Sequence, residues 1–285
     1  MKQAVYVSGL PRSGSTLLCQ LLGMHPDIYS TNHSSPLVAT LDQVKRTLSD
    51  DPFLLSQLDT DFDLAYDRIR RSMKAFLKAW LDDTEHPFAV DKSRGWLPQV
   101  EILRAIDPTF KMLVCIRDLG DIFASIEKKH RETILLDFPD HMASGNIQAR
   151  VNALFADQGV IGSPLLAIQN LQDITNQDIH SQIYFVAYEA LVENPVNTMQ
   201  EIYHFIGADK FEIDPENLVV KQEESDSYYR YKYPHKVKHA IMQPSRKNTS
   251  ETISLRIRTQ IINKVLWYYQ DFYPIIARTY TNGNT

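Results

Sequence analysis

Short apolar runs alternate with longer amphipathic stretches along this chain. Apolar runs bounded by polar or turn residues are typical of buried strands. They cover residues 3–8, 87–90, 111–116 and 182–187, and a weaker run covers residues 28–31. Apolar positions at helical spacing predict helices over residues 16–23, 62–81, 97–106, 121–131, 195–206 and 253–268.

Strands that alternate with helices predict a parallel sheet with both faces covered. We expect an α/β fold of three layers, with a central parallel sheet of about five strands flanked by helices. Residues 1–285 are expected to form a single domain. Residues 132–180 are less regular and predict either a helical insertion or plain scaffold. Residues 223–250 are polar and predict a long loop, of the kind that often forms a lid or binds a ligand.

Composition narrows the possible partners. The 285 residues are 44% hydrophobic and 10% aromatic, enough to fill a core, which argues against a disordered chain. The chain has 30 Lys and Arg residues and 35 Asp and Glu residues, which gives a net charge of −5. This charge argues against a nucleic-acid partner but allows a local site for one small polyanion. Cys19 and Cys115 lie in apolar runs and predict buried thiols in a reducing compartment. No membrane span or leader pattern is visible, so we expect a cytoplasmic protein.

The first candidate site follows the first strand. Residues 9–16 read Gly-Leu-Pro-Arg-Ser-Gly-Ser-Thr, with the glycine spacing of a phosphate-binding loop between a strand and a helix. Such a loop turns backbone N–H groups toward an anion at the helix N-terminus. Ser15 occupies the position of the lysine that nucleoside triphosphatases use, which counts against ATP or GTP hydrolysis. Arg12 could supply the missing charge; the alternative is a plain turn that needs two glycines.

The second candidate site follows the apolar run 111–116. Arg117 comes at the end of this strand, and Ser125 falls early in the next predicted helix. A guanidinium fork and a hydroxyl suit a terminal phosphate. Two alternatives are open: Arg117 could form a solvated bridge with Asp118 or Asp121, or Asp118 could hold magnesium, as in a kinase.

Together the two motifs resemble the sulfotransferase family that uses 3′-phosphoadenosine-5′-phosphosulfate (PAPS). Residues 8–16 look like the 5′-phosphosulfate loop of that family, and Arg117 and Ser125 match the spacing of its 3′-phosphate pair. Residues 91–93 are similar to its lysine-bearing segment, and residues 188–207 to its late Tyr-Glu and Phe-Ile-Gly stretch. Cytosolic members typically carry Lys where Arg12 stands, whereas Arg is the form of the tyrosylprotein branch and of many bacterial members.

The resemblance implies a phosphate-loop-type α/β fold with PAPS as donor, the nucleotide PAP as product and no metal. A sulfuryl group would move in line to a hydroxyl or amine of the acceptor. Arg12 and Lys92 would neutralise charge on the departing phosphate. The residues expected around the donor are Arg12, Ser13, Gly14, Ser15, Thr16, Arg117, Ser125 and Tyr188.

A hydroxyl acceptor also needs a base. Counted from the loop, His33 falls where the tyrosylprotein branch places its catalytic glutamate, and histidine titrates near neutral pH. We therefore expect His33 to be the base, with His130, His141 and His235 as weaker candidates.

The late polar region adds a further expectation. In the family a loop before the last helices closes over the 3′-phosphate and the adenine, and here Arg246 and Lys247 are the candidates for that contact. The Arg-x-Gly-x-x-Gly-x-Trp segment of the cytosolic branch is missing, and a solvated lid is the alternative.

The predicted function is therefore a sulfotransferase that acts on a small-molecule or peptide acceptor. A magnesium-dependent kinase and a catalytically silent nucleotide-binding module are the alternatives. The identity of the acceptor is open, as is the oligomeric state, for which a homo-oligomer is one option.

Overall fold

A computed structural model describes residues 2–31, 33–82, 84–139, 141–174, 177–219, 224–241 and 252–281. The central element is a sheet of five strands, all parallel, in the order β2-β3-β1-β4-β5. This agrees with the α/β fold that the apolar runs predict. The strands are β1 Gln3–Gly9, β2 Ile28–Tyr29, β3 Phe88–Lys92, β4 Lys111–Ile116 and β5 Ile183–Ala187.

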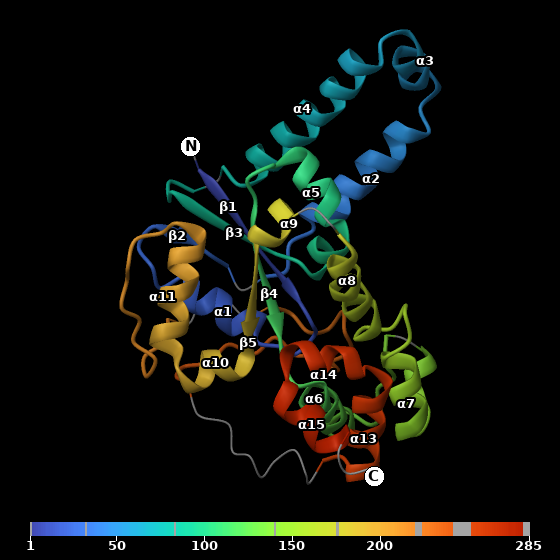
Figure 1. Cartoon of the computed structure of the whole chain (residues 1–285), viewed down its shortest axis with the longest axis vertical. Helices are drawn as coiled ribbons and strands as arrows, with labels where there is room; N and C mark the ends of the chain where they lie inside the picture. The colour runs from blue at the N-terminus through green and yellow to red at the C-terminus, as the bar shows by residue number, and fades with distance from the viewer. Residues whose placement is uncertain are drawn as a thin grey trace.

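Helices cover both faces of this sheet and extend beyond it (Figure 1). The helices of the first half are α1 Ser15–Leu22, α2 Leu37–Ser49, α3 Pro52–Thr60, α4 Phe62–Trp80, the 3₁₀-helix η1 Arg94–Gln99, α5 Val100–Ile106 and α6 Leu119–Glu132. Those of the second half are η2 His141–Ser144, α7 Ile147–Leu154, α8 Gly162–Asp173, α9 Gln177–Ser181, α10 Tyr188–Glu193, α11 Pro195–Ile206, α13 Leu255–Lys264, α14 Leu266–Phe272 and α15 Pro274–Thr281. Figure 1 shows α2, α3 and α4 projecting as an arm at one end of the molecule, and α13–α15 packed around α6 at the other.

The alternation of strand side chains divides the interior into two cores. Val5 and Val7 of β1 pack with α1 and α11 on one face, whereas Tyr6 between them packs with the larger cluster on the other face. Cys115 and Val114 of β4 divide in the same way. Because successive side chains of a strand point to opposite faces, burial on both faces requires a continuous apolar run. This explains why these strands are visible in the sequence.

Several element boundaries differ from the sequence prediction, most of them by one or two residues. Residues 97–106 were expected to form one helix, but a 3₁₀ turn that contains Pro98 precedes α5, because proline has no N–H to donate to a regular helix. The predicted helix 253–268 is interrupted at Val265, whose φ of −133° and ψ of 46° are not helical. Strand β3 runs two residues further than predicted and ends at Lys92. Residues 132–180 contain α7 and α8, and residues 224–241 have no helix or strand.

The strand order creates a crevice beside β1. The chain passes from β1 to β2 and β3 on one side, and then crosses to β4 and β5 on the other. Loops that leave neighbouring strands in opposite directions open a cleft at the carboxyl ends of those strands. Within the described residues, no helix is both long and apolar enough to span a membrane.

Candidate active site

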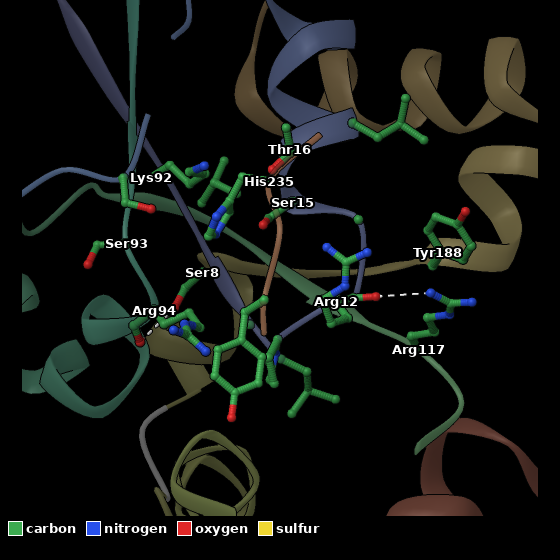
Figure 2. Close-up of a pocket in the computed structure, with 18 of the residues that line it drawn as sticks. Ser8, Arg12, Ser15, Thr16, Lys92, Ser93, Arg94, Arg117, Tyr188 and His235 are labelled. Atoms are coloured by element: carbon green, nitrogen blue, oxygen red, sulfur yellow. Dashed lines mark hydrogen bonds between the residues drawn. The ribbon is translucent and has the colours of Figure 1, made fainter. Parts of the chain in front are cut away.

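The register of the sheet brings three motifs together at one edge. Val7 of β1 pairs with Lys92, the last residue of β3, and Gly9 pairs with Cys115 of β4. Arg117 follows directly after β4. The loop of residues 9–16, called the glycine loop below, therefore lies between Lys92 on one side and Arg117 on the other (Figure 2).

The backbone of the glycine loop needs glycine at both ends. Gly9 has a φ of +124°, and a Cβ atom there would collide with the backbone of Cys115 in β4. Gly14 has a φ of +92° and caps α1, and its Cβ would lie 2.6 Å from Cδ2 of Tyr188. Only glycine adopts these conformations and permits this approach at little cost. The two glycines thus set the curve that aims the N-terminus of α1 at the crevice.

Arg12 lies in the middle of this loop in a left-handed conformation, with a φ of +58°. Its Nε donates to Ser125 Oγ at 3.3 Å, and another guanidinium nitrogen donates to the carbonyl of Pro234. Burial, and then the nearby charge of Arg117, lower the pKa of Arg12. The loop thus holds a desolvated cation, whose pairing with an anion would be worth more here than in water.

Arg117 is fixed against the same loop. One of its terminal nitrogens donates to the carbonyl of Arg12 at 3.1 Å, as Figure 2 shows, and its guanidinium lies over the Tyr188 ring at 4.3 Å from the centroid. Its backbone N–H and carbonyl both pair with the hydroxyl of Tyr268. Within the described part of the chain, Arg117 Nε is buried without a hydrogen-bond partner. A buried donor of this kind is costly unless a ligand satisfies it.

These motifs line a cavity of about 380 Å³, which is within the range of small-molecule sites. Glycine-loop residues, Ser15 and Thr16 among them, form one wall, and Ser34, Ser35 and Ser93 add hydroxyls. Although the whole chain is acidic, no Asp or Glu is among the described residues that line the cavity. Its lining cations are Arg12, Lys92, Arg94, Arg117, Lys236 and Lys238.

Lys92 lies beside two groups from the late polar region. Its Nζ pairs with Glu224 Oε2 at 3.1 Å. The same oxygen lies 3.8 Å from Nδ1 of His235. Burial raises the pKa of Glu224, but the charge of Lys92, the attraction of His235 when that ring is protonated, and hydrogen bonds from Ser34 and Lys92 together outweigh burial and leave the pKa below its ordinary value. Glu224 is therefore ionised at neutral pH, and it links β3 to the residues 224–241.

Residues 224–241 supply one side of the cavity, which the sequence predicted only in outline. The polar, Tyr- and Lys-rich composition indicated a loop of functional interest, but no periodicity showed which side chains face inward. His235 lines the cavity and was predicted only as a weaker candidate for the base. Lining residues to which the sequence gave no role include Ser34, Ser35, Ser93, Arg94, Tyr229, Tyr233, Pro234, Lys236 and Lys238.

Not every predicted residue reaches the cavity. Ser13 is buried and donates to the carbonyl of Leu10, and Ser125 accepts from Arg12. Both residues therefore stabilise the glycine loop, but they are not among the described residues that line the cavity. His33, predicted as the base, is half-buried and is not among the described residues that line the cavity, although its neighbours Ser34 and Ser35 are.

The remaining candidates lie elsewhere. The side chains of Arg246, Lys247 and His141 lie outside the described residues. Asp118, considered above as a magnesium ligand, caps α6, pairs with Arg258 at 2.8 Å and does not line the cavity.

Comparisons with known proteins agree with this architecture. The chain is 25% identical over 256 residues to an uncharacterized protein of Aquifex aeolicus and 27% identical over 240 residues to the nodulation protein NoeE of Sinorhizobium fredii. The matches cover 86% and 79% of this chain, but only 29% and 54% of those relatives. The solved sulfotransferase domain from the curacin biosynthetic pathway has the same fold, with a TM-score of 0.55 and 15% identity over 93% of this chain and 98% of the domain.

A comparison with protein families covers most of the candidate site. The sulfotransferase family matches residues 4–212, which include the glycine loop, Lys92, Arg117 and Tyr188. The match begins one residue inside β1, includes the other four strands and ends before residues 224–241. The strand order, the glycine loop without a lysine and the extent of this match agree, and the chain belongs to the sulfotransferase family.

Proposed function

We propose that this chain transfers the sulfuryl group of PAPS, in line and without a metal ion, to a hydroxyl or amine of a small-molecule or peptide acceptor. One observation carries the proposal: among the described residues, six cations and no carboxylates line the cavity at the glycine loop, in a chain of net charge −5. PAPS carries several negative charges and no γ-phosphate, so a site with this charge suits it. Membership of the sulfotransferase family supports the reaction class.

The donor would lie along the glycine loop. The N-terminus of α1, with Ser15 and Thr16, would bind the 5′-phosphosulfate through N–H groups and hydroxyls. Arg117 would bind the 3′-phosphate, because its unsatisfied Nε and its stacked, planar guanidinium suit a phosphate fork. Ser125 would act indirectly, by holding Arg12.

Transfer requires neutralisation of charge on the departing phosphate. Arg12 and Lys92 stand on two sides of the glycine loop, and both are largely buried, so their charges act in a medium less polar than water. Positioned donors of this kind lower the barrier because they need no reorganisation during the reaction, and the removal of one commonly costs about 10²–10³ in rate. Because cations of the chain would balance the negative charge of the donor, the electrostatics of the site do not require a metal ion.

Thermal unfolding with nucleotides tests this function. PAP at about 100 times its dissociation constant should add roughly 2.7 kcal/mol to the stability of the protein and raise the melting temperature by a few degrees. ATP with magnesium, at the same concentration, is the control. A shift with PAP that survives a chelator is the expected result. A magnesium-dependent shift with ATP and none with PAP would reject the sulfotransferase function and favour a kinase.

A further inference from the structure

The strongest unassigned feature of the cavity is the pair formed by Asp226 and His235. Oδ1 of Asp226 lies 3.0 Å from Nδ1 of His235 and also accepts the backbone N–H of His235 at 2.9 Å. The chain between them makes a tight turn, in which Arg230 and Tyr231 have φ values of +49° and +61°. Two successive non-glycine residues in the left-handed region are unfavourable, and such strain persists only where the surroundings impose it.

Anchors on several elements impose this turn. Lys232 is 0% exposed, and its Nζ donates to the carbonyl of Thr133 at 2.7 Å, at the end of α6. Arg12 of the glycine loop donates to the carbonyl of Pro234. Three residues after His235, the backbone of Lys238 pairs in both directions with the side chain of Gln20 in α1, at 2.9 and 3.0 Å. His235 is thus held between fixed points on either side, as a positioned catalytic group must be.

The imidazole of His235 faces the cavity near Lys92, as Figure 2 shows. Its Nδ1 faces Asp226, which sets the proton on Nδ1 and leaves the lone pair on Nε2. Within the described residues, Nε2 has no hydrogen-bond partner. The charged groups around the ring are Asp226, Glu224 and Lys92; burial lowers the pKa of His235 more than the two carboxylates raise it. The imidazole is therefore neutral at neutral pH.

We infer that His235 is the general base of the reaction and that Asp226 is its positioning residue. This inference rests on the proposed sulfuryl transfer. The acceptor oxygen forms a bond to sulfur, while the bond between sulfur and the 5′-phosphate oxygen breaks and leaves its electron pair on PAP. The hydroxyl proton moves to Nε2 of His235 and then to solvent, which balances the reaction.

The two other candidates for this role are less well placed. His33 is not among the described residues that line the cavity. Glu224 pairs with Lys92, and its lowered pKa makes it a weak base at neutral pH. His235 combines a position in the cavity, an available nitrogen and a carboxylate that orients it.

The test compares His235→Gln with His239→Gln, a matched change at an exposed histidine in the same segment. Turnover is measured as PAP released from PAPS, with phenol, whose hydroxyl stays protonated at neutral pH and therefore needs a base, and with water as acceptors, and PAP affinity is measured by calorimetry. We expect His235→Gln to lose at least about 10²-fold in turnover and to keep PAP affinity within about twofold. His239→Gln should match the wild-type chain in both. Asp226→Asn should lower turnover and move the acid limb of the pH–rate profile to lower pH, because the carboxylate stabilises the imidazolium.

Three other outcomes would contradict either the role of His235 or the proposed function. Turnover of His235→Gln within tenfold of wild type would remove His235 as the base, and a large loss in His33→Gln would then assign that role to His33. Parallel loss of turnover and of PAP affinity in His235→Gln would make His235 a donor-binding residue instead. A wild-type chain that neither binds PAP nor releases it from PAPS would refute the proposed function itself, which a failure confined to His235→Gln would not do.

Discussion

Replacement of Arg117 by alanine tests the donor site most directly. The side chain contributes a guanidinium with one buried, unpartnered nitrogen, a stack on Tyr188 at 4.3 Å and a 3.1 Å hydrogen bond to the carbonyl of Arg12. Hydrogen bonds to charged groups are worth about 1.5–3 kcal/mol. If Arg117 binds the 3′-phosphate, Arg117→Ala should weaken PAP binding by this amount, which is roughly 10- to 150-fold in the dissociation constant.

The assay is calorimetry with two ligands, PAP and 5′-AMP, because only PAP carries the 3′-phosphate. Arg117→Ala should weaken PAP binding and leave 5′-AMP binding nearly unchanged. Arg117→Lys, which keeps the charge but not the planar fork, should fall between the wild type and the alanine variant for PAP. Equal weakening of both ligands would mean that Arg117 acts by supporting the backbone of Arg12. Unchanged PAP affinity in Arg117→Ala would remove the residue from the site and refute the reasoning.

Three further changes separate catalysis, loop geometry and stability. Lys92→Ala should lower turnover by at least about 10²-fold and keep PAP binding close to wild type. Turnover equal to wild type, measured as PAP formed from PAPS, would contradict a catalytic role of Lys92. Gly14→Ala forces a Cβ to 2.6 Å from Tyr188 at a φ of +92°, so we expect a loss of about 1–2 kcal/mol in urea unfolding, and an unchanged midpoint would show that the loop can move. Arg150→Ala leaves the carboxylate of Glu127, 1% exposed, without its ion-pair partner, and should cost about 3–5 kcal/mol; a loss under 1 kcal/mol would indicate that water reaches the pair.

The parts of the fold that the sequence predicted are those with a local signal. Strand β4 was predicted at its observed bounds, because a strand buried on both faces is apolar at every position. Helix α11 was also predicted at its observed bounds; Pro195 begins it and Gly207, with a φ of +82°, ends it. Pro98 is also a local signal for an irregular start of the helix. The apolar residues around it have helical spacing, however, so the sequence predicted one continuous helix and not a 3₁₀ turn.

The residues of the candidate site likewise differ in whether a local sequence pattern identifies them. Arg12 and Arg117 were identified because a glycine loop and a strand end each have a recognisable local pattern, and the structure places both in the cavity. The role of the base could not be assigned by such a pattern. Counting along the chain favoured His33, whereas the side chain that faces the cavity is His235, which the sequence ranked only as a weaker candidate. The roles of all these residues stay predictions until the variants are measured.

The amino-acid sequence alone determined the succession of strands and helices, the glycine loop and the arginine after β4, because each depends on the periodicity and identity of neighbouring residues. The strand order, and hence the meeting of Lys92 with the glycine loop, depends on which strands pair. The approach of His235 to Lys92 depends on a long irregular segment that is held by Lys232, Arg12 and Gln20. No periodic pattern encodes contacts of this kind, because they arise from side chains that are distant in the sequence, and only the tertiary structure decides them.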